Sequence, residues 1–250
     1  MTADQPLWTP SKERMADSAM TAFMGFAGKR AGRSFEGFDD LHAWSVSDLE
    51  GFWSAVWDFC GVVGDKGDRM LVDADKMPGA AFFPDARLNY AENLLRRNDD
   101  GDAIVFWGED KVRRRMSWRE LNDLVSRMQQ ALAAAGVGVG DRVAAMMPNM
   151  PETTALMLAT ASLGATFSSC SPDFGKRGVL DRFGQIEPKV FVSCDGYWYN
   201  GKEIAVADKL AAIESQLPTA EQIWIVSYLE RAEAVAGGLT RATPLDAVLA

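Results

Sequence analysis

Apolar residues recur at helical spacing in the first 60 or so positions of the chain. Between residues 10 and 28 this spacing predicts one helix, with Thr9 as its cap, Pro10 at its first position and Gly28 as its stop. The apolar positions of its buried face are Met15, Ala19, Ala22, Phe23 and Phe26. The pattern therefore begins as a helical region rather than a sheet.

A second helix is predicted over residues 47–60, where Ser47 and Glu50 have the spacing of a capping box and Gly61 follows as a stop. Its apolar stripe is rich in aromatic residues and comprises Leu49, Phe52, Trp53, Val56, Phe59 and Cys60. Residues 62–88 follow no period and contain prolines and glycines. A short helix capped by Asn89, with Glu92 at the third position, is expected next.

From about residue 102 the pattern changes to alternating strands and helices. Residues 103–107 and 111–118 predict a pair of strands joined by a turn at Gly108-Glu109-Asp110. Ser117 and Glu120 then cap a long helix that ends at Gly136. Its buried face is predicted to comprise Leu121, Leu124, Val125, Met128 and Leu132.

Strands near 142–147, 165–170, 189–194 and 222–228 are separated by predicted helices over 152–164, 176–186 and 202–216. This alternation predicts an α/β fold with a doubly wound, mainly parallel sheet and helices on both faces. Such sheets bind ligands at the carboxyl ends of their strands. Residues 169–177 and 193–203 are expected to line that edge.

The 250 residues are 48% hydrophobic and carry a formal net charge of −9, with a pI near 4.7. The acidic balance disfavours nucleic acid as a partner, and Arg113–Arg115 is interpreted as a solvated strand edge. No signal peptide and no membrane span is recognisable. Three cysteines without metal-type spacing suggest buried thiols of a reducing cytoplasm, and His42 is expected to be structural or at the surface.

No self-contained catalytic or metal-binding motif is found, so no catalytic residue and no metal ligand is assigned. The glycines of residues 136–141 follow a helix and precede a strand, the reverse of a dinucleotide fingerprint, which disfavours a Rossmann oxidoreductase. Residues 197–203, Tyr-Trp-Tyr-Asn-Gly-Lys-Glu, combine stacking faces with a glycine and a lysine expected in the first turn of a helix. The stretch suits a phosphate-bearing nucleotide and equally an aromatic plug over the end of the sheet.

From "LNYAENLL" to "QIWIVSYL" the chain resembles acyl-CoA synthetases of the adenylate-forming superfamily, close to acetyl-CoA synthetase. The phrases "GDRVAAMMPNMPETTALMLATASLGA" and "SSCSPDFG" are more narrowly similar to the acetoacetyl-CoA synthetase branch. The resemblance implies a helical N-terminal extension of the acetyl-CoA synthetase type over residues 1–98. Residues 99–250 would form the first α/β subdomain of an AMP-binding domain, truncated at residue 250.

The resemblance also implies a CoA site. The turn at the family's CoA entrance matches Ser171, Pro172 and Asp173, and its Arg-Ala-Gly-Arg segment matches Tyr199, Asn200, Gly201 and Lys202. In this segment Lys202 replaces an arginine that binds the 3′-phosphate of CoA, and Tyr199 replaces another.

The activity implied is an acetoacetate–CoA ligase that uses ATP, CoA and Mg²⁺, with the family's phosphate loop and adenylation lysine beyond residue 250. The segment alone is expected to be inactive and to require the C-terminal part of the same chain, with self-association as a further expectation. A stand-alone nucleotide- or CoA-binding module without catalysis is the alternative.

Overall fold

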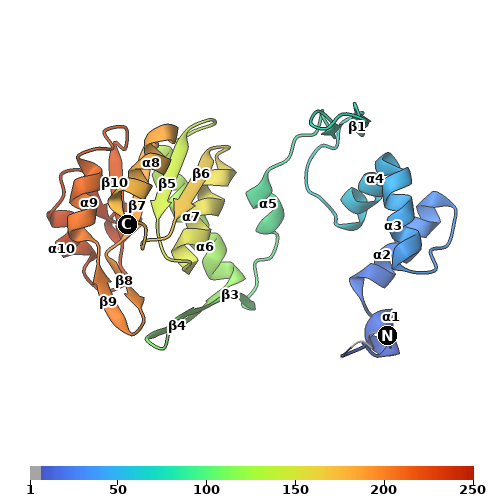
Figure 1. Cartoon of the computed structure of the whole chain (residues 1–250), viewed down its shortest axis with the longest axis horizontal. Coiled ribbons are helices and arrows are strands. Elements are labelled where there is room, and N and C mark those ends of the chain that lie inside the picture. Colours follow the sequence, from blue (N-terminus) through green and yellow to red (C-terminus); the bar gives the residue numbers. More distant parts are fainter. Residues whose placement is uncertain (1–6) are drawn as a thin grey trace, which may run out of the picture. The chain divides into compact units, whose positions relative to one another are not determined.

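The computed structural model describes residues 7–250, which form two compact units divided between Leu88 and Asn89 (Figure 1). The first unit is helical with one small β-ribbon, and the second is an α/β unit. The expected domain limits, 1–98 and 99–250, stay a prediction.

The predicted helix over residues 10–28 is wrong, because the structure has two helices there, α1 (Lys12–Ala16) and α2 (Ala19–Ala31). Ser18 accepts a hydrogen bond from the Thr21 amide at 3.2 Å and so begins a new helix. The helix continues past Gly28 to Gly32, which has φ 64°. Gly28 lies inside this helix, and its lack of a side chain leaves room for the Arg33 carbonyl oxygen, which would stand 2.6 Å from a Cβ.

The capping box at Ser47 is also wrong. Ser47 is the last residue of α3 (Phe38–Ser47), and Asp48 caps α4 (Leu49–Phe59) by accepting from the Gly51 amide at 2.9 Å. The buried core of this unit is made by α2, α3 and α4 and comprises Phe23, Ala27, Leu41, Trp44 and Ala55. Two short antiparallel strands follow, β1 (Leu71–Val72) and β2 (Ala81–Phe82).

The α/β unit begins with α5 (Tyr90–Leu94), where Asn89 is the cap as predicted. The predicted strand pair is confirmed as an antiparallel hairpin, β3 (Asp102–Gly108) and β4 (Val112–Ser117). The capping box of Ser117 and Glu120 is present at the start of α6 (Trp118–Ala134), and its five buried residues are the five predicted.

The central sheet has the strand order β11-β10-β7-β5-β6, and every pair in it is parallel. Its strands are β5 (Arg142–Met146), β6 (Thr166–Cys170), β7 (Val190–Cys194), β10 (Gln222–Val226) and β11 (Ala242–Pro244). The helices are α7 (Pro151–Ser162), α8 (Lys176–Ile186), α9 (Ala207–Glu214), α10 (Ala232–Gly237) and α11 (Leu245–Val248). The mainly parallel α/β fold is confirmed.

Helices cover both faces of this sheet (Figure 1). Alternate residues of β5 show why: Val143 and Ala145 pack in the cluster with α6 and α7, whereas Ala144 and Met146 pack with α8, α9 and α10. Because successive side chains of a strand point to opposite faces, a strand buried on both sides is apolar throughout.

The predicted helix over residues 202–216 is wrong at its start. Residues Gly196–Tyr199 and Lys202–Ala205 form the antiparallel strands β8 and β9, and the helix begins only at Ala207. The physical reason is the Asn200-Gly201 pair, whose φ angles of 49° and 71° form a two-residue hairpin turn. Lys202 therefore lies on a strand and not at a helix N-terminus.

Candidate functional site at the carboxyl edge of the sheet

Both segments expected to line a ligand site lie at the carboxyl edge of the parallel sheet. Ser171, Pro172 and Asp173 directly follow β6, and the β8–β9 hairpin follows β7 after Asp195. Strands β6 and β7 are the two neighbours of β5, so the segments leave the sheet on either side of one strand. This is the edge at which doubly wound sheets bind ligands.

The turn after β6 is held by a lysine from another helix. Lys209, in the first turn of α9, donates hydrogen bonds from Nζ to the Pro172 carbonyl and, at 3.1 Å, to the Phe174 carbonyl. Pro172 is buried, whereas Ser171 and Asp173 are exposed. Burial lowers the pKa of Lys209, and the nearby Cys194, Cys170 and Asp173 oppose this shift. Lys209 thus ties the residues that follow the hairpin to the turn at Ser171–Asp173.

The β8–β9 hairpin presents the other predicted residues. Tyr199 and Lys202 are the last facing pair, and Asn200 and Gly201 form the turn between them. Tyr199 is 64% exposed, and Lys202 is exposed as well. In the part of the chain that the structure covers, no carboxylate lies within ion-pair distance of Lys202.

The amides of this turn are already engaged by Glu109, which lies in the turn between β3 and β4. One carboxylate oxygen accepts from the Asn200 amide at 2.5 Å and the other from the Gly201 amide at 2.7 Å. The Lys111 ammonium lies 5.8 Å from the centre of the Trp198 ring. These contacts fasten the tip of the β8–β9 hairpin to the tip of the β3–β4 hairpin.

The three aromatic residues of the hairpin have different surroundings. Tyr197 is half-buried and packs against both core clusters, and Trp198 is also half-buried. Burial raises the pKa of Tyr197, and the Asp173 carboxylate adds to that shift. Asp173 thus influences the titration of Tyr197 on the other predicted segment. Tyr199 alone of the three presents an exposed ring.

Asp195, the residue between β7 and β8, fixes the base of the hairpin. Its side chain is buried and accepts three backbone hydrogen bonds, from Tyr228 at 2.9 Å, Leu229 at 2.8 Å and Arg231 at 2.6 Å. These amides belong to the segment after β10. The carboxylate thus joins the ends of two adjacent parallel strands at the candidate site.

The two cysteines beside this edge are poor nucleophiles. Burial raises the pKa of Cys170 to about 11 and that of Cys194 to about 12, so both are protonated thiols at neutral pH. The expectation of buried thiols is confirmed for these two and is wrong for Cys60, which is exposed. Neither buried thiol supplies a catalytic group.

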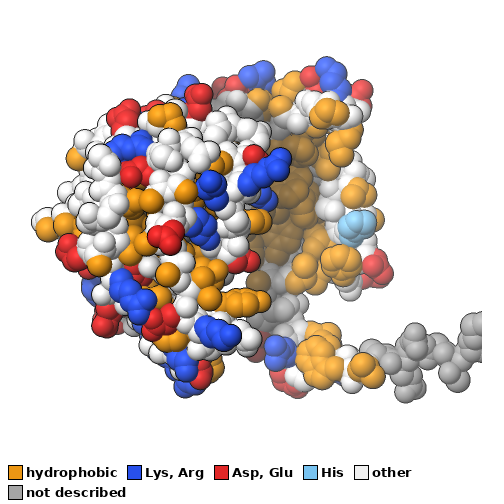
Figure 2. All heavy atoms as spheres, turned by 60° about the vertical axis from the view of Figure 1, so that its left-hand side comes forward, with side chains coloured by type: hydrophobic (Ala, Val, Ile, Leu, Met, Phe, Trp, Pro, Cys, Tyr) orange, Lys and Arg blue, Asp and Glu red, His pale blue; other side chains and the backbone are white. Residues whose placement is uncertain are grey.

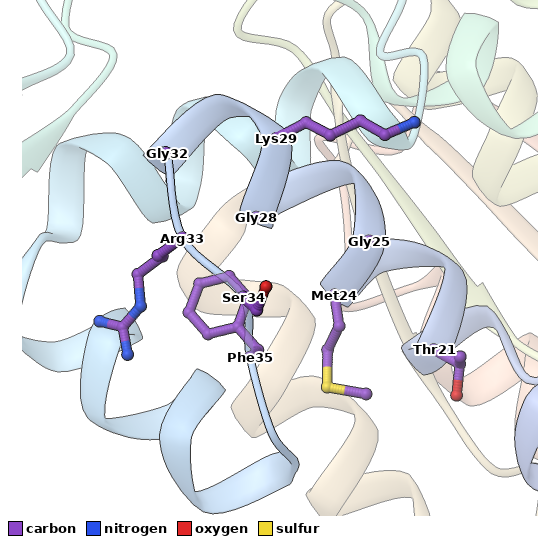
Figure 3. Close-up of a pocket in the computed structure, with 9 residues that line it drawn as sticks. All are labelled: Thr21, Met24, Gly25, Gly28, Lys29, Gly32, Arg33, Ser34 and Phe35. Atoms are coloured by element: carbon purple, nitrogen blue, oxygen red, sulfur yellow. The ribbon is translucent and has the colours of Figure 1, made fainter.

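Outside this edge, a hollow of about 580 Å³ lies beside α2 and the following segment (Figure 3). Its Lys29 and Arg33 side chains extend in opposite directions in the view, and Arg33 forms an ion pair with Asp40. None of the residues predicted to bind CoA lines this hollow. Because Lys29 and Arg33 extend apart and Arg33 is paired with Asp40, the two cations of the hollow do not converge on one ligand position.

Across residues 7–250, no group of three or more His, Cys, Asp or Glu side chains is placed to hold a metal ion. Within the same residues, no helix is both long and apolar enough to cross a membrane. His42 lies within α3, where its ring stacks on Phe38 at 6.0 Å, and it is exposed at the surface, as expected (pale blue in Figure 2).

Glu109, Lys209 and the acceptor role of Asp195 were missed from the sequence. Of the three, Lys209 could most easily have been found. A cation in the first turn of a helix is unfavourable for the helix dipole, so its presence there indicates a partner outside the helix. Glu109 gives no local signal, since its partners are 91 and 92 positions away.

Comparison with known proteins places these features in a family. Residues 91–245 match the family described as AMP-binding enzyme, and residues 38–94 match the acetyl-coenzyme A synthetase N-terminus. Acetoacetyl-coenzyme A synthetase of Rhizobium meliloti is 57% identical over 244 residues, which are 97% of this chain and 38% of that protein. Acetoacetyl-CoA synthetase of Macaca fascicularis is 36% identical over 92% of this chain and 35% of its own length.

Among solved structures, acetoacetyl-CoA synthetase from Streptomyces lividans is similar with a TM-score of 0.88 and 37% identity. The match covers 99% of this chain and 38% of that structure, so the chain spans well under half the length of its relatives. The AMP-binding match alone extends over more than half of the 250 residues. The chain belongs to the family of AMP-binding enzymes.

Proposed function

We propose that this chain is the N-terminal part of an acetoacetate–CoA ligase. The complete protein would join acetoacetate to the AMP moiety of ATP with release of pyrophosphate. The CoA thiol would then attack the acyl-adenylate, giving acetoacetyl-CoA and AMP. The observation that supports this proposal best is the 57% identity to a protein named for that acyl group over nearly the whole chain.

Within that enzyme, residues 1–98 would form the N-terminal extension and residues 99–250 the first α/β subdomain. The segment would supply scaffold and part of the entrance for CoA, and no catalytic side chain. The proposed contacts are Ser171, Pro172, Asp173, Tyr199, Asn200, Gly201 and Lys202. Their placement at one edge of the sheet, after the two strands that flank β5, supports a shared site.

The residues fit a CoA phosphate in one respect and oppose it in another. Lys202 offers an exposed ammonium for the 3′-phosphate, and the ring of Tyr199 offers a surface for stacking. Asp173 and Glu109 add negative charge nearby, and Glu109 occupies the turn amides. While Glu109 holds the turn amides, the Lys202 side chain is the group available to contact the phosphate.

ATP and Mg²⁺ would be held by residues beyond this segment, and we derive no step through either. Residues 7–250 offer no cluster of carboxylates for a metal ion. The partners proposed for the chain are a short acyl acid and the C-terminal part of the same enzyme. Self-association through surface normally covered by that part, and a cytoplasmic location, are proposals as well.

A chimeric enzyme tests the proposed function. In it, these 250 residues replace the matching segment of the Rhizobium meliloti synthetase, and acetoacetate-dependent ATP–pyrophosphate exchange and acetoacetyl-CoA formation are measured. We expect both activities in the chimera and neither in the 250-residue chain alone. A folded chimera without exchange would contradict the ligase assignment. Nucleotide or CoA binding by the isolated chain combined with an inactive chimera would favour the non-catalytic binding module.

In the active chimera, Lys202→Ala should weaken CoA binding while leaving formation of the acyl-adenylate unchanged. Loss of one charge-assisted hydrogen bond to phosphate costs about 1.5–3 kcal/mol, so the KM for CoA should rise about ten-fold or more. Dephospho-CoA, which lacks the 3′-phosphate, is the control and should respond little to the substitution. Equal losses with CoA and dephospho-CoA would show that Lys202 does not meet this phosphate.

A further inference from the structure

The turn at Asn200-Gly201 has the geometry of a backbone anion site. Both residues have positive φ angles, 49° and 71°, and their successive amides converge on one carboxylate at 2.5 and 2.7 Å. Successive N–H groups in a turn form concave sites that bind anions. Hydrogen bonds from backbone amides to a carboxylate are charge-assisted.

The anion at this site belongs to the protein itself. Glu109 reaches the turn from the β3–β4 hairpin, where it has a φ angle of 52°, an uncommon conformation for a residue other than glycine. The hairpin is anchored at Gly108, where a Cβ would stand 2.0 Å from the Tyr228 hydroxyl oxygen. A side chain at position 108 would therefore require Tyr228 to move, and Gly108 directly precedes Glu109.

Two lysines and one further acid lie in or next to the two hairpin turns. Lys202 follows the turn directly, and Lys111 lies over the Trp198 ring. Asp110 forms an exposed ion pair with Lys111 at 3.4 Å and makes no contact with the turn amides among the hydrogen bonds that the structure describes. A turn with two converging amides and a lysine next in sequence suits a phosphate group, and in this structure the Glu109 carboxylate occupies those amides.

We propose that the Asn200–Gly201 amides form a phosphate-binding site that Glu109 fills, and that a phosphate-bearing ligand binds by displacing the Glu109 carboxylate. The identity of this ligand as CoA rests on the proposed function, but the competition by Glu109 does not. After displacement, the two amides would donate hydrogen bonds to the phosphate oxygens instead of to Glu109. Lys202, the next residue in the chain, would add a positive charge. Glu109 is in this sense a determinant of affinity rather than a catalytic residue.

The 250-residue chain itself serves for the experiment, with adenosine 3′,5′-bisphosphate as the probe and adenosine 5′-monophosphate and inorganic phosphate as comparison ligands. The variants are Glu109→Gln and Glu109→Ala, and Asp110→Asn is the matched control, since it removes one negative charge from the neighbouring residue. Titration calorimetry gives the affinities. Hydrogen exchange over residues 196–205 and 108–112 reports the state of the two hairpin tips.

Without any probe, we expect faster exchange over residues 196–205 in both Glu109 variants and no change in Asp110→Asn. Affinity for adenosine 3′,5′-bisphosphate should rise about ten-fold in Glu109→Gln, the equivalent of one charge-assisted hydrogen bond regained. In Asp110→Asn the change should stay below about two-fold, as for an exposed charge. Probe binding to the unsubstituted chain should speed exchange over residues 108–112, because the displaced Glu109 releases its turn.

Three results would overturn the inference. Unchanged exchange over residues 196–205 in both Glu109 variants would mean that the carboxylate does not hold the amides. Unchanged or lower affinity in those variants, or no probe binding at all, would mean that Glu109 does not compete with phosphate. Equal gains in affinity in Glu109→Gln and Asp110→Asn would mean that the loss of one negative charge, and not the freeing of the amides, causes the effect. None of these results depends on the chimera, so failure here is distinguishable from failure of the ligase assignment.

Discussion

Substitution of Asp195 by alanine removes the acceptor of three backbone hydrogen bonds at the base of the candidate site. The carboxylate is 2% exposed and accepts from Tyr228, Leu229 and Arg231, which lie in the segment after β10. The substitution also deletes a buried charge, so no unpaired carboxylate remains. Three amides lose their acceptor at once, and the connection between the ends of β7 and β10 is broken.

The expected cost follows from these bonds. Hydrogen bonds to charged groups contribute about 1.5–3 kcal/mol each when well formed. Because these amides are only partly buried, water can hydrogen-bond to them in the variant, which lowers the cost of the substitution. We expect Asp195→Ala to destabilise the α/β unit by about 3–5 kcal/mol. Asp195→Asn keeps an acceptor for Tyr228 and Leu229 but places an N–H donor against the Arg231 amide. Its cost should be about 1–3 kcal/mol.

Hydrogen exchange of the β10 amides measures this loss for the α/β unit alone, which global denaturation of a two-unit chain does not. Exchange of Gln222–Val226 should accelerate about a hundred-fold or more in Asp195→Ala, since each 1.4 kcal/mol is a factor of ten. Asp110→Ala, at an exposed position, should change stability by less than about 0.5 kcal/mol. If Asp195→Ala left β10 exchange within about three-fold of the unsubstituted chain, the three bonds would not contribute as argued.

Other predictions concern α6, the turn after β6 and the buried thiols. Ser117→Ala removes the capping box with Glu120 and should lower α/β-unit stability by about 1 kcal/mol in β5 exchange; no loss would contradict the cap's contribution. In the active chimera, Lys209→Met should raise the KM for CoA without slowing ATP–pyrophosphate exchange, and Lys209→Arg should restore part of it; unchanged KM would show that the Pro172 turn does not need this lysine. The raised pKa of Cys194, about 12, stabilises the fold below pH 9, and this contribution is lost as pH rises from about 9 towards 12. Stability should therefore fall more steeply over this range in the unsubstituted chain than in Cys194→Ala, by up to about 1.4 kcal/mol per pH unit, and parallel pH profiles would refute it.

Local patterns were sufficient for most of the α/β unit. The five buried positions of α6 and its capping box could be predicted because helical spacing and cap chemistry involve residues within a few positions of one another. The parallel sheet could be predicted because strands buried on both faces are apolar throughout and alternate with helices. The carboxyl edge as the place of the site follows from that topology alone.

Where local signals compete, the sequence was interpreted wrongly. Ser18 divides a continuous apolar pattern into two helices, and Asp48 rather than Ser47 caps α4. The Asn200-Gly201 turn overrides the helical spacing that follows it and places Lys202 on a strand. In each case two local arrangements were compatible with the same residues, and a cap or turn decided which one formed.

Residue patterns were enough to infer the fold class, the family resemblance and the edge of the sheet where the site is expected. Which groups meet there became visible in the folded chain: Glu109 with the Asn200 and Gly201 amides, Lys209 with the Pro172 carbonyl, and Asp195 with the segment after β10. These partners lie 33 to 92 positions apart along the chain. A hydrogen bond at that separation leaves no periodic trace in the sequence, because its geometry is set by how the strands pair and not by residue spacing.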